Sequence, residues 1–271
     1  MAKLELTLPP VRTIALSQPL VWLARGWRDL MAVGPLSLLH GVALALGGAA
    51  ISWFFGQHFW FLAGSLSGFL LVAPVLATSL YALSRALQKQ QAPNFQVVLR
   101  TWLNWHDSHI DKWSGPYWSM VQLGCLLALA GTGWVLTSAA FITLLAPVPI
   151  ATPIDFVRHV MLAPQGWLFE AWLALGAVGC APVFASSVVS MPLLLDRRVT
   201  LMQAVLTSWQ TVLANPIPLA IWATLILCLT AFGFATLFLG LVVVVPWLGH
   251  ASWHAYCDLV DAQAWPERTE T

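Results

Sequence analysis

Six long apolar stretches constrain the fold of this chain more than any other feature of its sequence. They cover approximately residues 35–55, 60–84, 117–145, 167–195, 216–232 and 235–259. A helix crosses the hydrocarbon core of a membrane with about 20 apolar residues, within a range of about 17 to 25, so each stretch is long enough to span it. We therefore predict an all-α protein with six transmembrane helices in a single polytopic membrane domain, residues 1–271.

The composition supports this class and excludes others. Hydrophobic residues make up 59% of the chain and charged residues only 8%, whereas soluble domains carry about 25% charged residues. The formal net charge is +1, while a protein that binds nucleic acid needs a clearly basic face. We therefore expect membrane lipids as partners, with a protein partner or membrane complex as a further option, and no nucleic acid.

The basic residues indicate how the spans are threaded. Lys and Arg in short loops favour the cytoplasmic side of a membrane, and eleven of the twelve fall on one side of the predicted spans. They are Lys3, Arg12, Arg25, Arg28, Arg85, Lys89, Arg100, Lys112, Arg197, Arg198 and Arg268. Only Arg158 falls on the other side, in the proline-rich segment 147–166. Both termini are therefore predicted to be cytoplasmic.

Three segments on the cytoplasmic side, which contain or adjoin basic residues, are predicted to form amphipathic helices that lie in the membrane interface. Segments 18–34, 95–105 and 200–214 place apolar residues at helical spacing beside a polar face, which is typical of such helices. The apolar stripes are Leu20, Leu23, Trp27, Leu30 and Met31; Phe95, Val98, Leu99, Trp102 and Leu103; and Met202, Val205, Leu206, Trp209, Val212 and Leu213. Trp27, Trp102 and Trp209 are the predicted interfacial anchors, since Trp favours the boundary between lipid and water.

The six spans are predicted to form three hairpins, each preceded by one of these surface helices. Short turns are expected at 56–58 and at Gly233, and Gly34-Pro35 and Asn215-Pro216 should each end one helix and start the next. The returning helix of each hairpin carries an internal proline after an apolar or small-residue run, at Pro74, Pro192 and Pro246. We therefore predict a threefold internal repeat over about 18–89, 95–198 and 200–261. The alternative is a chance recurrence in an apolar sequence rich in Pro and Trp.

His250 and His254 are the strongest candidates for a site, because two His at i and i+4 share one helix face and can ligate a metal or haem. His40 could face them across a helix bundle, as bis-His haem would require. The zincin motif HExxH is excluded because Ala251 replaces its Glu. We favour hydrogen bonding to neighbouring helices for His250 and His254 and do not favour the pairing with His40, and we expect no metal, no cofactor and no catalytic residue.

Other residues admit a functional and a structural interpretation. Glu170 near the outer start of the fourth span could serve a proton relay, but a position at the interface is favoured. Pro74, Pro192 and Pro246 could kink three helices around a central cavity, although packing is favoured. The cytoplasmic cluster 106–111 (HDSHID) is interpreted as a solvated turn. The charged residues at the span ends need only extend to water; they are Arg85, Asp196, Arg197, Arg198 and Asp258.

Two terminal segments carry a resemblance to a known family. Pro10-Val11-Arg12 with Trp22-Leu23-x-x-Gly26-Trp27-x-Asp29-Leu30, and the closing segment 246–259 (PWLGHASWHAYCDL), resemble bacterial six-span membrane proteins classed as a domain of unknown function. More distantly, the layout is similar to the membrane domain that precedes some glycerophosphodiester phosphodiesterases. The resemblance covers nearly the whole chain and implies the bacterial inner membrane. It implies no catalytic residue, because the family has none assigned.

The favoured function from sequence is therefore non-enzymatic, a membrane scaffold or accessory subunit that contacts lipid or a partner complex. A small transporter is the first alternative, and it predicts a polar cavity lined by residues such as His40, Ser187, Ser190 and His250. A haem- or metal-binding protein that uses His250 and His254 is the second.

Overall fold

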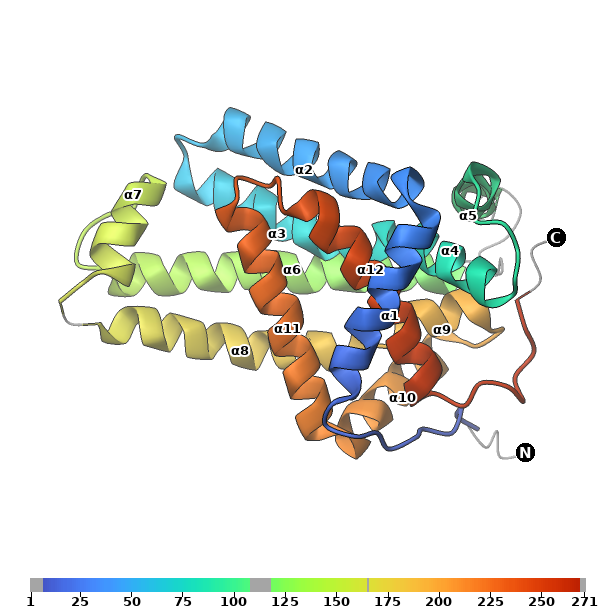
Figure 1. Cartoon of the computed structure of the whole chain (residues 1–271). Helices are drawn as coiled ribbons and strands as arrows, with labels where there is room; N and C mark the ends of the chain where they lie inside the picture. The colour runs from blue at the N-terminus through green and yellow to red at the C-terminus, as the bar shows by residue number, and fades with distance from the viewer. Residues whose placement is uncertain (1–6, 108–117, 165, 269–271) are drawn as a thin grey trace. The chain divides into compact units, whose positions relative to one another are not determined.

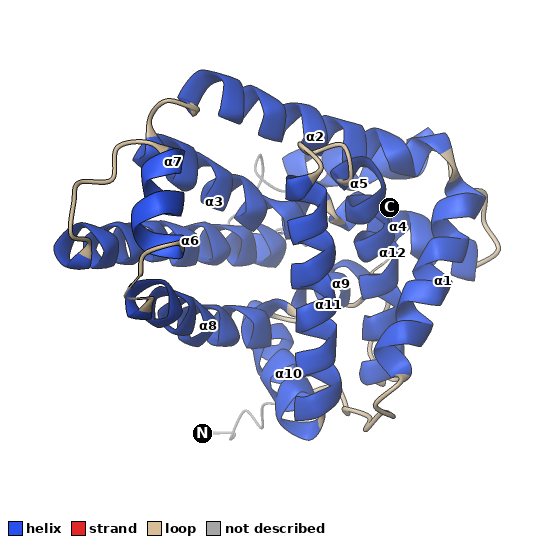
Figure 2. Ribbon diagram, turned by 60° about the vertical axis from the view of Figure 1, so that its left-hand side comes forward, coloured by secondary structure: helices blue, strands red, loops and turns tan. Residues whose placement is uncertain are grey.

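The computed structural model describes residues 7–107, 118–164 and 166–268, without the side chains of 70–75 and 104–107. Every regular element in these ranges is a helix, and two isolated bridges join extended segments (Figures 1 and 2). The chain forms two compact units. The first unit comprises Met1–Ala45, Pro74–Gly124 and Ala185–Thr271, and the second comprises Leu46–Ala73 and Cys125–Phe184.

The three predicted surface helices are present in the first unit as α1 (Gln18–Val33), α5 (Phe95–Asp107) and α10 (Leu201–Ala214). Local sequence signals set their ends. The N–H of Gly34 bonds to the Leu30 carbonyl at the end of α1, and Gly34 has a φ of 66°, which glycine adopts without strain. At the start of α10, Thr200 and Gln203 form a reciprocal capping box.

Both predicted helix junctions are confirmed. Helix α2 (Pro35–Phe55) begins directly after Gly34, and α11 (Pro216–Ala235) begins directly after Asn215. Proline suits the first turn of a helix because its missing N–H has no partner there and its φ is already helical. Each Pro therefore starts the long apolar helix that follows a surface helix.

The core of the first unit is formed by α4 (Thr78–Gln88), α9 (Ser190–Asp196) and α12 (Leu241–Leu259). Residues 78–86 of α4 and all seven residues of α9 are buried. Helix α12 buries Leu241, Val244, Ala251, Trp253 and Leu259. These three helices carry most of the polar side chains discussed below.

Helix α1 packs closely along α12, and glycine makes this approach possible. A Cβ at Gly26 would lie 2.6 Å from the backbone N of Ala251. A Cβ at Gly41, in α2, would lie 2.1 Å from the Val242 carbonyl oxygen. Both distances are shorter than real Cβ contacts, so only glycine fits at these two positions.

The second unit contains parts of α2, α3 (Phe59–Leu76), α6 (Trp118–Leu145) and α8 (Trp167–Ser187), with the short α7 (Pro153–Phe156) and η1 (Val157–Met161). Its core is a cluster of buried apolar residues, and most of the partly buried side chains packed against this cluster are aromatic. Phe156 stacks on Phe59 at 5.0 Å and meets Trp172 edge-on at 5.4 Å. The short elements α7 and η1 thus fold the predicted outer segment 147–166 against the ends of the long helices of this unit.

Four helices are long and apolar enough to cross a membrane: Pro35–Phe55, Trp118–Leu145, Trp167–Asp196 and Pro216–Ala235. They match the first, third, fourth and fifth predicted spans. The second and sixth predicted spans are not among them. Phe59–Phe69 is a shorter apolar helix, and α12 covers the sixth. The protein therefore has several membrane-spanning helices, and the number six stays a prediction.

Three details of the predicted hairpins were wrong. The second span is not one helix, because it breaks at Ala77 between α3 and α4. The fourth span breaks before α9. Gly233 is not the turn of the last hairpin, since it lies inside α11, where a Cβ would be 2.3 Å from Leu241. The turn follows at residues 236–240.

The order of surface helix, long helix and returning helix recurs three times along the chain. The returning helix is broken in the first two copies, as α3–α4 and α8–α9, and continuous in the third, as α12. The two compact units do not follow the predicted repeat boundaries, because α2, α3, α6 and α8 each begin in one unit and end in the other. The threefold repeat stays a prediction.

Candidate functional site

His250 is the centre of a buried polar network in the first unit. Its side chain is fully buried, with an exposed fraction of 0%. Its Nε2 lies 2.7 Å from Ser37 Oγ of α2, and its Nδ1 lies 2.7 Å from Ser84 Oγ of α4. One imidazole on α12 therefore connects three helices.

The direction of these hydrogen bonds follows from the number of protons available. Ser84 donates its single hydroxyl proton to Asp29 Oδ2 at 2.6 Å, so toward His250 its oxygen can only accept. Nδ1–H of His250 is then the donor, and in the neutral ring Nε2 accepts from the Ser37 hydroxyl. Both ring nitrogens of His250 and both serine hydroxyls therefore have partners.

Asp29 is the charged end of the network. It accepts from Ser84 and lies 2.9 Å from Nε2 of His254, one turn beyond His250 on α12. Burial raises the pKa of the Asp29 carboxyl, but hydrogen bonds from His254 and Ser84 outweigh this effect and hold the pKa below its ordinary value of 3.8. The Asp29 carboxylate on α1 thus orients His254 directly and His250 through Ser84.

His40 lies near this network but has its own partners. Its Nδ1 bonds the Leu36 carbonyl at 2.9 Å, and its Nε2 lies 2.7 Å from Ser79 Oγ. Both ring nitrogens of His40 and of His250 are therefore engaged with protein atoms. Among the described residues, no group of three or more His, Cys, Asp and Glu side chains is placed to hold a metal ion. The hydrogen bonds agree with the structural role favoured for His250 and His254 from sequence.

Ser190 and the prolines proposed to surround a transport cavity have defined positions in the helices. Ser190 is fully buried and donates to the Ser186 and Ala204 carbonyls at 2.6 Å and 3.1 Å. Pro192 stands in the first turn of α9, where proline starts a helix rather than kinking it. Pro246 is buried inside α12, and the side chain of Pro74 lies outside the described residues.

Arg85 and Asp196 form a buried ion pair, and here the sequence interpretation was wrong. Their exposed fractions are 7% and 6%, so neither extends to water as predicted. Arg85 Nε lies 2.8 Å from Asp196 Oδ1, and Tyr256 donates its hydroxyl to Asp196 Oδ2 at 2.8 Å. Arg197 pairs with the same carboxylate at 2.8 Å. The two charges are buried because each lies on a core helix, α4 or α9.

The terminal motifs that carry the family resemblance meet in space. The N–H of Arg12 bonds the Leu259 carbonyl at 2.8 Å, and Asp261 pairs with Arg12 in return at 2.9 Å. Asp258 accepts hydrogen bonds from Gln18, Trp22 and Arg25 of α1. Hydrogen bonds and ion pairs thus join α1 and the residues before it to α12 and the residues after it.

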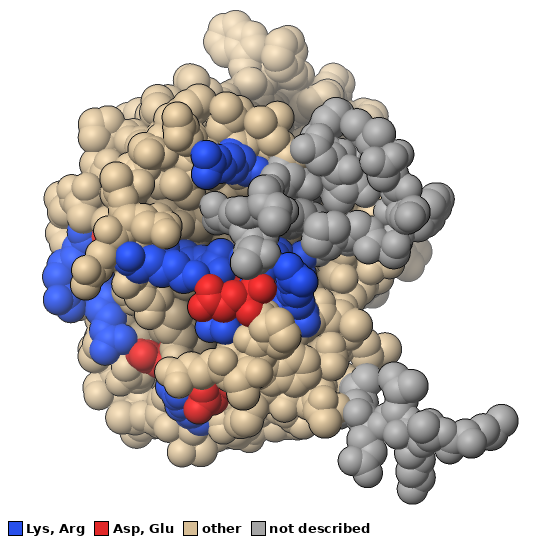
Figure 3. Space-filling view, turned by 90° about the vertical axis from the view of Figure 1, so that its right-hand side faces the viewer, with Lys and Arg blue, Asp and Glu red and all other residues tan. Residues whose placement is uncertain are grey.

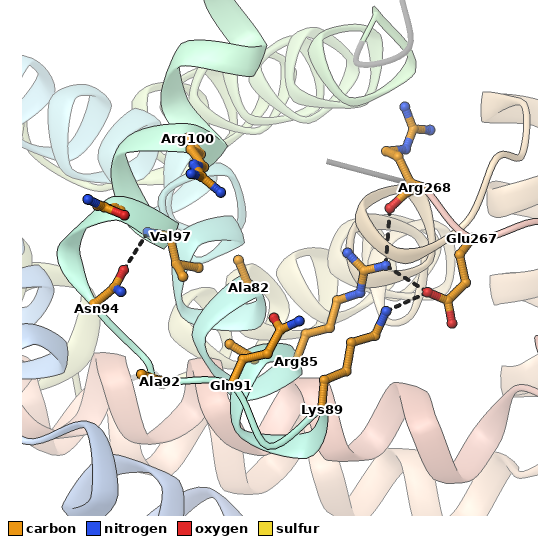
Figure 4. Close-up of a pocket in the computed structure, with 12 residues that line it drawn as sticks. Ala82, Arg85, Lys89, Gln91, Ala92, Asn94, Val97, Arg100, Glu267 and Arg268 are labelled. Carbon is orange, nitrogen blue, oxygen red and sulfur yellow. Dashed lines mark hydrogen bonds and ion pairs between the residues drawn. The ribbon is translucent and has the colours of Figure 1, made fainter. Parts of the chain in front are cut away.

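A basic cavity of about 490 Å³ opens between α4, α5 and the C-terminal segment (Figure 4). It is lined by charged, amide and small side chains: Ala82, Arg85, Ala86, Lys89, Gln91, Ala92, Asn94, Gln96, Val97, Arg100, Glu267 and Arg268. Figure 3 shows Lys and Arg side chains gathered around acidic ones on one face of the molecule. This cavity was not predicted from the sequence, since its walls come from distant segments, with Lys89 and Glu267 178 residues apart.

Each of the three surface helices exposes a line of large apolar side chains. These are Leu20, Trp27 and Met31 of α1; Phe95, Leu99 and Leu103 of α5; and Met202, Trp209 and Leu213 of α10. Exposed fractions reach 58% at Leu20, 62% at Phe95 and 73% at Leu213. The predicted apolar stripes are therefore only partly exposed, because Leu23 and Leu30 of α1 and Val98 of α5 are buried.

The predicted anchors and Glu170 have defined places. The ring of Trp27 meets that of Trp247 edge-on at 5.2 Å, Trp102 packs partly against the buried cluster of Leu80, Leu83 and Val98, and Trp209 donates to Ser186 Oγ at 2.9 Å. Glu170 is exposed in the first turn of α8, where the helix dipole favours a negative charge. The cluster 106–111 lies outside the described residues, apart from the backbone of 106 and 107.

A comparison with protein families places the chain among membrane proteins. Residues 61–196 match the model of a family described as a predicted integral membrane protein, DUF2189. No curated protein and no solved structure matches the chain. The more distant similarity to phosphodiesterase membrane domains therefore rests on the sequence layout alone.

Proposed function

Because the chain belongs to the DUF2189 family of predicted integral membrane proteins, we propose that it is a non-enzymatic scaffold of the bacterial inner membrane. In this proposal six spans anchor the protein, with both termini in the cytoplasm. Helices α1, α5 and α10 lie at the cytoplasmic surface of the membrane and insert their exposed apolar side chains between the lipids. The lipid-facing helices then support a partner complex or organise the lipid around it.

The observation that carries this proposal is the line of exposed apolar side chains on each surface helix. In α1 the members Leu20, Trp27 and Met31 follow the spacing i, i+7 and i+11, which places them on one side of the helix. Leucine, methionine and tryptophan on the surface are unfavourable in water by about 25 cal/mol per Å² of apolar area. A lipid boundary removes this cost, and Trp is favoured there.

The position of the charges supports the same arrangement. Arg25 and Arg28 of α1 and Arg100 of α5 are on the helices that carry the apolar lines. Cations near an anionic lipid surface contribute about 1 kcal/mol each. An interfacial helix typically combines such cations with an apolar face that enters the lipid.

The buried network supports a structural rather than a catalytic role for the His residues. The ring of His250 is fully buried, and its two nitrogens bond Ser37 and Ser84. A catalytic group must reach its substrate, and a ligating His needs a free ring nitrogen. No described contact therefore favours the haem or transporter alternative over the scaffold.

Depth-dependent quenching tests the proposal. The four native cysteines, Cys125, Cys180, Cys228 and Cys257, are free and would first be replaced by serine. Leu99→Cys and Gln96→Cys, both exposed on α5, would then carry an environment-sensitive fluorophore in the full chain, reconstituted in vesicles. Spin-labelled lipid should quench the label at 99 strongly and the label at 96 weakly. Equal, weak quenching at both positions would refute insertion of α5.

A further inference from the structure

We propose that the basic cavity between α4, α5 and the C-terminal segment binds a phosphate-bearing anion, as the headgroup of an anionic phospholipid or as a soluble phosphate ester. The inference deepens the proposed function, on which it rests for the cytoplasmic membrane surface, by naming a ligand class for one part of that surface. It depends on three features of the cavity: its cations, the end of α5 that faces it and the carboxylate that already occupies one wall.

Cations stand on two opposite walls of the cavity. Arg85 extends from the last turn of α4, Lys89 directly follows that helix, and Arg100 extends from α5 on the other side (Figure 4). Arg268 contributes its backbone carbonyl, which accepts from Arg85 at 3.2 Å, while its guanidinium points away. The volume of about 490 Å³ falls within the range of about 300–1,000 Å³ for small-molecule sites.

The N-terminal turn of α5 faces the same space. Asn94 precedes the helix and accepts from the N–H of Val97 at 3.2 Å, and Gln96 and Val97 of the first turn line the cavity. The first N–H groups of a helix and its dipole favour a negative charge at this end. Side-chain amides at Gln91 and Gln96 add donors that suit phosphate oxygens.

The carboxylate of Glu267 already occupies a position in the cavity where neighbouring cations stabilise a negative charge. It pairs with Lys89 and lies 3.6 Å from Arg85 Nη2. Of the three cations, Arg85 already pairs with Asp196 and Lys89 with Glu267, so Arg100 supplies the excess of positive charge in the lining. A phosphate with one or two charges would complete this balance, and Glu267 is the group it would compete with.

Lipid is one source of the phosphate, and the surroundings of the cavity accommodate it. Phe95 and Leu99 are exposed on α5, next in sequence to the lining residues Gln96, Val97 and Arg100. Acyl chains could lie along these apolar side chains while the headgroup enters the cavity. Basic pockets at the cytoplasmic side of membrane helices commonly bind lipid headgroups in this manner.

The test uses the full chain purified in a neutral detergent. Native mass spectrometry would count phosphatidylglycerol adducts, with phosphatidylcholine as the zwitterionic comparison, and calorimetry would measure binding of glycerol 3-phosphate. Lys89→Gln/Arg100→Gln should lower the affinity for phosphatidylglycerol roughly 30-fold, because two cations are removed. Glu267→Gln should raise it, because the competing carboxylate is lost.

Arg158→Gln/Arg198→Gln is the matched control, because it removes the same charge from two exposed positions outside the cavity. Lys89 and Arg100 are also exposed, so unchanged melting temperatures would show that both double variants fold. Binding of phosphatidylglycerol alone identifies a lipid, and binding of glycerol 3-phosphate with the same dependence on Lys89 and Arg100 identifies a soluble ester.

Equal affinities in the two double variants, or no binding of either probe, would overturn the proposed site. The quenching experiment on Leu99 separates this failure from that of the scaffold. Stronger quenching at 99 than at 96 should persist in Lys89→Gln/Arg100→Gln, since the apolar side chains of α5 remain in place.

Discussion

Individual polar side chains hold together parts of the chain that are far apart in sequence. His250 connects α2, α4 and α12 through Ser37 and Ser84, and Asp29 extends the network to α1. A buried polar group without a partner costs about 1–3 kcal/mol, more than a typical hydrogen bond contributes. Removing the central imidazole therefore affects both hydroxyls that it bonds.

We expect His250→Leu to lower the free energy of unfolding by about 2–4 kcal/mol, because Ser37 and Ser84 each lose a buried partner. Thermal unfolding of the detergent-solubilised chain measures the change. His58→Leu is the control, since His58 is exposed in the turn between α2 and α3. Equal effects of the two substitutions would contradict a structural role for His250.

Asp29 predicts a pH dependence of stability. Its pKa in the folded protein lies below the ordinary value of 3.8 because hydrogen bonds from His254 and Ser84 outweigh the effect of burial. A carboxyl with a lowered folded pKa stabilises the protein above its unfolded pKa, and this stabilisation disappears as the pH falls through the folded pKa. Melting temperatures between pH 7 and pH 3 should therefore fall less steeply in Asp29→Asn than in the native chain. Parallel curves would show that Asp29 makes no such contribution.

At the scale of elements, the contact between α1 and α12 determines how the first unit is assembled. Gly26 lets the two helices approach, Asp258 accepts from three α1 side chains, and Trp247 donates to the Leu23 carbonyl at 2.7 Å. By contrast, the Gly64-x-x-x-Gly68 pattern of α3 makes no comparably close approach. A Cβ at Gly64 would be 3.5 Å from Val135, an ordinary contact, and Gly68 has open space.

Alanine substitutions at these glycines should therefore have opposite effects. Gly26→Ala should destabilise the protein, because its Cβ would lie 2.6 Å from a backbone atom of α12 and the helices would have to separate. Gly68→Ala should be neutral or stabilising by up to about 1 kcal/mol, because alanine has the higher helix propensity. The melting temperatures of the two variants give the comparison. A loss at Gly68 larger than at Gly26 would mean that α3 rather than α1 makes the critical contact.

At the scale of the whole molecule, the apolar surface requires a membrane. The four span-length helices are mostly unburied, with only 17% to 44% of their apolar windows inside the protein. Trp53, Leu144 and Val178 are among the most exposed of their large apolar residues. Surface of this extent belongs in lipid, so these helices contact the bilayer.

Single-cysteine labelling tests the predicted threading. With six spans, a membrane-impermeant maleimide added to intact spheroplasts should label Gln57→Cys, Ala151→Cys and Leu239→Cys. Gln91→Cys and Gln263→Cys should react only after permeabilisation. Identical labelling of positions 57 and 91 would show that α3 does not cross the membrane. Identical labelling of positions 239 and 263 would show that α12 does not cross it.

The sequence alone determined the properties that depend on near neighbours. Apolar length identified the long helices, helical spacing identified α1, α5 and α10, and the Gly34-Pro35 and Asn215-Pro216 junctions were confirmed. The favoured role of His250 and His254 in hydrogen bonding agrees with the contacts. Each of these inferences uses spacing within one segment or one residue type, so a single sequence is sufficient for it.

Only the tertiary structure decided which helices are buried and which polar side chains meet. Asp29 and His254 are 225 residues apart. Arg85 and Asp196 lie on two different helices, and the sequence predicts each of them only as a charged residue at the end of a span. The burial of α4 and α9, and the cavity that Arg85, Lys89 and Arg100 share, depend on contacts between distant segments. Such contacts depend on how several helices pack at once, and no local spacing in the chain encodes them.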